Sequence, residues 1–171
     1  MKLRDVLALS LGAAMVAACN SGEDSVVAEA EEPAPVLTPA PTPTAAPDGT
    51  ALVAGSWDVN ENPDGARAVF AENGGEPKLA IICDRMSGTV TMDIASSSQT
   101  PEAWRVDAGG EAARLDMAPV DGGLSAEIDP GLALFNAFST QNEVVALTSP
   151  TGDRMQFPTH PGITRVLTAC S

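Results

Sequence analysis

Apolar and polar residues alternate with a period of two along much of the chain between residues 51 and 171. One such run places Val90, Met92 and Ile94 on one face and Thr91 and Asp93 on the other, as expected of a strand with one buried side. The same alternation recurs around Trp57 and Val59, Leu79 and Ile81, Trp104 and Val106, Leu115 and Met117, Leu124 and Ile128, and Met155 and Phe157. Glycine-rich turns separate these segments, and short connections favour antiparallel neighbours. The pattern predicts a mainly β domain, built as a small antiparallel sheet or sandwich.

One segment inside the domain has helical spacing instead. Asp129 is of a residue type typical of N-caps, and Pro130 is favoured in the first turn of a helix. Apolar residues then follow at intervals of three, at Leu132, Phe135 and Phe138. A short internal helix is therefore predicted over residues 130–138.

A second helix is predicted at the C-terminal end of the chain. Ile163, Val166, Leu167 and Cys170 stand at positions i, i+3, i+4 and i+7, which places them on one face of a helix. Thr159 precedes this stripe and is the expected N-cap.

The first nineteen residues have the order of a secretory signal. The basic residues Lys2 and Arg4 come first, an apolar run follows, and a Val-Ala-Ala-Cys tetrapeptide ends at Cys19. This tetrapeptide resembles the lipobox of bacterial lipoprotein precursors. The resemblance implies that a signal peptide of residues 1–18 is removed, that the Cys19 sulfur carries a diacylglycerol, and that the new amino terminus accepts a further acyl chain such as palmitate.

The location of the protein follows from the same resemblance. The apolar run is shorter than the roughly 20 residues that a membrane-spanning helix needs, so acyl chains rather than a retained helix are expected to hold the chain at the membrane. Lipoproteins kept at the inner membrane often carry Asp after the lipidated cysteine, whereas Asn20 stands here. We therefore expect a cell-envelope protein, lipid-anchored at the outer membrane and facing the periplasm.

Residues 19–50 are the lipidated cysteine followed by a segment rich in Pro, Ala and Glu, with few apolar side chains that could pack. Such a composition cannot offset the entropic cost of ordering, and closely spaced prolines extend the chain. A disordered linker is therefore predicted over residues 19–50. The 121 residues that follow, 51–171, suffice for one β-rich globular domain with one core.

The chain is acidic, with a formal net charge of −14. The segment 20–50 contains six acidic residues and no Lys or Arg, and residues 51–171 contain 16 acidic and seven basic residues. A negative surface repels nucleic acid and anionic headgroups, which excludes both as ligands of the folded part. A basic partner would be favoured electrostatically.

Three cysteines are present. If Cys19 carries lipid, Cys83 and Cys170 remain as a pair in an oxidising compartment and are expected to form a disulfide. The strand predicted over residues 78–84 places Cys83 on the same face as Leu79 and Ile81, and the helical stripe places Cys170 on the buried side of the last helix. The bond is thus predicted to hold the last helix against the sheet.

The sequence offers few groups for catalysis. Its single histidine, His160, lies between Thr159 and Pro161 at a predicted helix start, where a surface role is expected, and the chain has no tyrosine. Nucleophile elbows, phosphate-binding glycine loops and dinucleotide fingerprints are absent from it. Neither an enzyme nor a bound cofactor is predicted.

The segment 58–65 begins like a calcium loop, with oxygen-bearing side chains at alternate positions. However, Pro63 stands where the loop needs glycine, and Val69 stands where it needs a bidentate glutamate. A polar hairpin loop is the favoured interpretation. One histidine and no spare thiol also argue against zinc, so no metal site is predicted.

The few aromatic residues admit two interpretations: a ligand groove or the hydrophobic core itself. The core is favoured, because a small domain with so few aromatics needs them for packing. The set consists of Trp57, Phe70, Trp104, Phe135, Phe138 and Phe157.

Two functional hypotheses follow. The stretch from Phe157 and Pro158 to Cys170 resembles the end of uncharacterised bacterial envelope lipoproteins, which favours a non-catalytic binding or accessory domain with an envelope protein as a partner. Lysozyme-inhibitor lipoproteins also join a lipid anchor to a small disulfide-bonded β domain, which makes an inhibitor of a periplasmic or secreted enzyme the alternative. Their inhibitory loop carries an aromatic residue that the segment 64–68 lacks.

Overall fold

The computed structural model describes residues 45–170, and in this part of the chain it contains nine strands and two short helices. Every neighbouring strand pair is antiparallel, in the order β1-β2-β3-β4-β7-β6-β5-β8-β9. The strands are β1 (Ser56–Asn62), β2 (Gly65–Ala71), β3 (Pro77–Asp84), β4 (Thr89–Ala95), β5 (Glu102–Ala108), β6 (Glu111–Val120), β7 (Gly123–Ile128), β8 (Val144–Thr148) and β9 (Arg154–Pro158). The helices are α1 (Ala133–Ala137) and α2 (Ile163–Thr168). The predicted antiparallel, mainly β fold with an internal and a C-terminal helix is confirmed.

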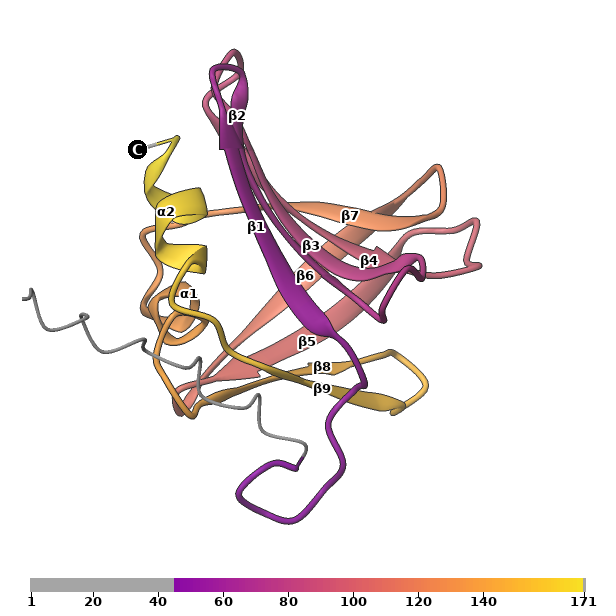
Figure 1. Cartoon of the computed structure of the whole chain (residues 1–171). Coiled ribbons are helices and arrows are strands. Elements are labelled where there is room, and N and C mark those ends of the chain that lie inside the picture. Colours follow the sequence, from indigo (N-terminus) through magenta and orange to yellow (C-terminus); the bar gives the residue numbers. More distant parts are fainter. Residues whose placement is uncertain (1–44, 171) are drawn as a thin grey trace, which may run out of the picture. The chain divides into compact units, whose positions relative to one another are not determined.

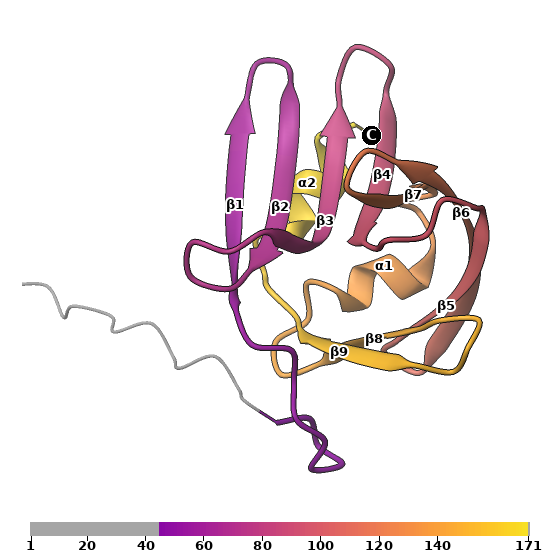
Figure 2. The same ribbon diagram turned by 90° about the vertical axis from the view of Figure 1, so that its right-hand side faces the viewer.

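The strands form one curled sheet (Figure 1). Its two halves are joined by β6, which pairs with β5 through residues 111–117 and with β7 through residues 118–120. Figure 2 shows α1 inside the curl, with β1 to β4 on one side and β5, β8 and β9 on the other. The helices therefore cover the inner face of the sheet, and the opposite face is its outer face.

The core fills the inner face of the sheet. Because side chains alternate between the two faces of a strand, every second residue of the predicted runs points inward, and Val90, Met92 and Ile94 are each at most 2% exposed. Phe70 is fully buried and makes edge contacts with Trp57 and Phe157, at centroid distances of 5.4 and 5.2 Å. The other three aromatic side chains are also buried, so the prediction that the aromatics form the core is confirmed.

The two edges of the sheet meet at one point. The indole Nε1 of Trp57 in β1 donates to the carbonyl oxygen of Pro158 in β9 at 2.6 Å. Just before β1, the backbone N–H of Val53 donates to the carbonyl oxygen of Gln156 at 2.8 Å. These bonds join strands that lie at opposite ends of the strand order.

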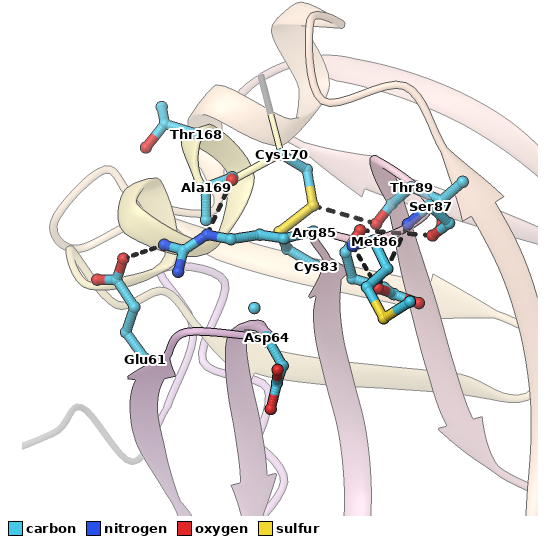
Figure 3. Close-up of a disulfide and its surroundings, with 12 residues drawn as sticks. Glu61, Asp64, Cys83, Arg85, Met86, Ser87, Thr89, Thr168, Ala169 and Cys170 are labelled. Carbon is cyan, nitrogen blue, oxygen red and sulfur yellow. Dashed lines mark hydrogen bonds and ion pairs between the residues drawn. A yellow bond between two sulfur atoms is a disulfide. The ribbon is translucent and has the colours of Figure 1, made fainter.

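The predicted disulfide is confirmed. Cys83 in β3 and Cys170, just beyond α2, are bonded, with 5.8 Å between their Cα atoms (Figure 3). Ile163, Val166 and Leu167 form the buried face of α2. This helix packs on β1, β2 and β3. The disulfide therefore joins the segment that follows α2 to the end of β3.

Arg85 reinforces the same corner of the molecule (Figure 3). Its guanidinium donates to the carbonyl oxygen of Asn62 at 2.6 Å and to that of Ala169 at 3.4 Å, and it forms an ion pair with Glu61. One side chain thus connects the β1–β2 turn to the C-terminal end of α2, where unpaired carbonyls attract a cation.

Both helices begin later than predicted. The Asp129 carboxylate accepts from Gly131 N–H and its carbonyl accepts from Leu132 N–H, so residues 129–132 form a turn and α1 begins at Ala133. The predicted cap at Asp129 is therefore wrong by one turn.

Thr159 is likewise not an N-cap. Its hydroxyl donates to backbone carbonyls of Thr140 and Glu143, and Gly162 occupies the N-cap position of α2. Pro161, together with the bond between the His160 ring and Gly162, keeps the intervening residues outside the helix.

Candidate functional site

Residues 45–53 lie just before the first strand, and we call them the strap. Ala45 forms an isolated β-bridge with Ala51, and Ala46 N–H donates to the carbonyl oxygen of Thr50 at 2.8 Å. Ala46 is only 7% exposed, and Val53 is bonded to β9 as described above. Residues 45–50 belong to the range predicted as linker; in the structure they form a hydrogen-bonded turn beside the sheet.

The outer face of β5, β6, β8 and β9 carries two neighbouring rows of residues, as the strand registers show. The arginine row runs across the strands as Arg114, Arg105, Thr148 and Arg154. The glutamine row lies two residues along each strand and contains Ala112, Asp107, Ala146 and Gln156. Because alternate residues share a face, all of these side chains lie on the side away from the core.

A groove of about 350 Å³ lies between the strap and these rows. Residues 46–48 of the strap form one wall, and the small side chains of Ala112 and Ala146 leave space above the sheet. The β5–β6 turn and the start of β8 close one end, with Glu111 and Glu143. We call this hollow the Gln156 groove.

Gln156 lines this groove and is its most unusual member. The side chain is 5% exposed, and its amide oxygen Oε1 is buried without a hydrogen-bond partner in the part of the chain that the structure describes. An acceptor left unpaired in this way costs about 1–3 kcal/mol. Buried amides are ordinarily paired, so this one marks the place where a donor is missing.

Charged groups surround the amide. Arg105 makes a forked contact with Asp107, with N–O distances of 2.6, 2.9 and 3.0 Å, and this hydrogen bonding and the carboxylate charge raise the pKa of Arg105. The pKa of Asp48 in the strap is lowered, chiefly by the backbone N–H and side chain of Thr50 and further by hydrogen bonding from Gln156 and the charge of Arg154. The Asp48 carboxylate is therefore stabilised mainly within the strap, with smaller contributions from Gln156 and Arg154.

Comparison of the chain with protein-family models, with curated proteins and with solved structures gives no match. The groove is thus interpreted from its own residues.

Cys19, the predicted lipidation site, lies outside the described residues. The segment 58–65, tested above as a calcium loop, forms most of β1 and the tight turn to β2, as the hairpin interpretation predicted. The Asn62 carboxamide oxygen accepts from the N–H groups of Asp64 and Gly65, at 2.9 and 3.0 Å. Within residues 45–170, no cluster of three or more His, Cys, Asp or Glu side chains is placed to hold a metal ion.

The segment 64–68, the counterpart of the inhibitory loop in lysozyme-inhibitor lipoproteins, does not form a protruding loop. Residues 65–68 belong to β2 and are paired with β1 on one side and with β3 on the other. Gly65 lies so close to the carbonyl oxygen of Cys83 that a Cβ atom would approach it to 2.0 Å. The segment is therefore the turn residue Asp64 followed by the first residues of β2, which lie between two neighbouring strands.

His160 lies between β9 and α2, and its ring has a local structural contact. Its Nδ1 accepts from Gly162 N–H at 3.1 Å. Burial, with a smaller contribution from the charge of Arg165, lowers the pKa of the ring. A neutral imidazole is therefore required to hold the start of α2.

We predict a pH-dependent loss of stability from this contact. Because the folded-state pKa of His160 lies below the unfolded value of about 6.5, the unfolded chain binds more protons in the interval between the two values. The free energy of unfolding should therefore fall as pH drops from about 6.5 toward the folded-state pKa. Urea unfolding at pH 7 and at intervals down to pH 5 measures it.

His160→Asn is the matched control, because its amide oxygen can accept from Gly162 but does not titrate. Its unfolding free energy should change less over the same pH range. Equal pH dependence in the two proteins would contradict the assignment to His160.

A second hollow, of about 370 Å³, lies on the outer face of β2, β3 and β4 beside the β6–β7 turn, and Val69, Ile82 and Val120 make much of its lining apolar. Neither of the two unpaired buried side-chain atoms in the described residues, Ser139 Oγ and Gln156 Oε1, belongs to a residue that lines it. No helix in the described part of the chain is long and apolar enough to span a membrane.

The alternation of apolar and polar residues does not predict the Gln156 groove. Gln156 occupies a polar position between Met155 and Phe157, which in an alternating strand predicts an exposed side chain. The strap residues, in turn, have the composition of the linker. The polar side chain of Gln156 in the last strand is the one feature of the sequence that points to this site. Its burial, however, depends on a contact between segments about 110 residues apart.

Proposed function

We propose that this chain is a lipid-anchored protein of the cell envelope whose domain binds a small polar ligand in the Gln156 groove and acts as a non-catalytic accessory module. One observation carries the binding role: Gln156, a residue that is 95% buried and whose amide oxygen is unpaired, lines a hollow that small side chains keep open. Sites for small molecules are typically concave hollows of this size or larger, with a few fixed polar groups that set orientation.

The chemistry of the groove supports binding rather than turnover. Its polar groups are arginines, carboxylates and an amide, and the Arg105 guanidinium is already engaged by Asp107. The one histidine, which would be the usual general base near neutral pH, is engaged with Gly162. The inhibitor alternative gains no support from the segment 64–68, because those residues are part of the sheet and its turn.

A thermal-shift screen tests the binding role. The lipidated full chain in detergent would be exposed to amines, sugars, carboxylates and short peptides, and at least one class should raise the melting temperature. A ligand at 100 times its dissociation constant adds about 2.7 kcal/mol to the stability of the folded state. Gln156→Leu should abolish the shift, and a screen in which no compound shifts the wild type would contradict the proposal.

The anchor is tested independently. Mass spectrometry of the mature protein from bacterial membranes should show acyl mass on Cys19, and Cys19→Ser should release the chain from the membrane fraction. An unmodified Cys19 in the mature protein isolated from bacterial membranes would contradict the lipoprotein assignment. The binding role would then be decided by the thermal-shift screen alone.

A further inference from the structure

We infer that the ligand of the Gln156 groove is a short peptide with a free carboxyl and a free amino end, a conclusion that rests on the proposed binding role. The inference is based on three features: the unpaired amide, the order of charges along the groove, and the small side chains of its floor.

The amide of Gln156 is complementary to a peptide unit. Its unpaired Oε1 needs an N–H donor, and its N–H₂ group can donate to a carbonyl or carboxylate oxygen. A peptide supplies both partners side by side, whereas a simple amine or a simple carboxylate supplies only one. Oε1 is buried, and residues 46–48 line the same groove as Gln156, so a peptide donor would reach Oε1 by displacing this part of the strap.

The charges along the groove have a direction. Arg105 and Arg154, from the arginine row, lie at one end, Gln156 lies in the next row, and Glu111 and Glu143 lie at the other end. Thr148 lies four residue steps along β8 from Val144, a distance of about 13 Å. An extended peptide of three or four residues has about this length, with its carboxylate near Arg154 and its ammonium near the glutamates.

The arginine end is suited to a carboxylate. The charge of Arg154 helps to lower the pKa of the Asp48 carboxyl in the strap, and arginine binds carboxylates through two parallel N–H donors. The peptide carboxylate would pair with Arg154 when the strap is displaced. The floor between Asp107 and Gln156 is formed by Ala146, so a side chain of methyl size fits above it.

Isothermal titration calorimetry of the lipidated full chain in detergent tests the inference. The probes are trialanine, trialanine with an amidated carboxyl end, and trialanine with an acetylated amino end. Trialanine should bind, and blocking either end should weaken binding about tenfold or more, as expected for a lost hydrogen bond to a charged group.

Two variants and a control locate the site. Gln156→Leu and Arg154→Gln should each weaken trialanine binding about tenfold or more. Arg114→Gln is the matched control, because Arg114 belongs to the same row but does not line the groove, and its affinity should equal that of the wild type. Arg154 is exposed, so its variant reports on binding even if Gln156→Leu alters the fold.

The outcomes separate the inference from the proposed function. Equal affinity for the blocked and free peptides, or equal losses in all three variants, would overturn the peptide assignment. If trialanine does not bind but the screen yields another ligand that depends on Gln156, the peptide class is wrong and the binding role stands. If neither experiment finds a Gln156-dependent ligand, both fail.

Discussion

Replacing Cys83 and Cys170 together by alanine is expected to lower the free energy of unfolding by about 4 to 5 kcal/mol. The disulfide joins residues 87 positions apart, so its removal restores the freedom of a long loop to the unfolded chain. Domains of this size have a total stability of about 5–15 kcal/mol, so the variant should be partly unfolded at physiological temperature. Urea unfolding monitored by tryptophan fluorescence measures the change.

Reductant provides the control for this prediction. Dithiothreitol should lower the stability of the wild type to nearly that of the double variant and should leave the double variant unchanged. A loss below about 1 kcal/mol would show that the apolar face of α2 and the Arg85 contacts hold the C-terminal segment without the disulfide.

The second large effect is expected from Phe70→Ala, which should cost about 3–5 kcal/mol. Phe70 is fully buried and contacts Trp57 in β1 and Phe157 in β9, so it fills the space where the two edges of the sheet approach. Its removal leaves a cavity and also two aromatic rings without their edge-to-face partner.

Phe70→Leu is the comparison that separates these contributions. It retains most of the apolar volume and should cost clearly less than the alanine variant. Thermal unfolding of the two proteins, measured side by side, gives the difference. Equal losses would indicate that the aromatic geometry rather than the cavity determines stability at this position.

The strands of the first half were predictable because their burial follows directly from period-two alternation. Val90, Met92 and Ile94 are an example, since each inward residue is apolar and each outward one is polar or small. The disulfide was also predictable, because both cysteines lie on apolar faces defined by their own segments.

β8 was not predicted, for the opposite reason. Its residues Val144 to Leu147 are a continuous apolar run, so no alternation marks a strand. Both faces of β8 are covered: the inner face packs in the core, and on the outer face Ala146 is 2% exposed beside the strap and Gln156. The same tertiary contact hid the candidate site. The helix starts were misplaced because Asp129 and Thr159 are good caps by type, but their side chains bond within a turn and to a distant loop instead.

The attachment of the strap determines how the domain would respond to a pulling force. Tension applied to the chain before residue 45 reaches the folded part at the Ala45–Ala51 bridge and then at the bond from Val53 to Gln156. These contacts would break one after another. The nine-stranded sheet, in contrast, would resist the force through many hydrogen bonds that are loaded at the same time. If the proposed lipid anchor holds this chain at a membrane, stretching it would uncover Gln156 before any strand of the sheet is lost, and the groove would respond to the distance between the domain and the membrane.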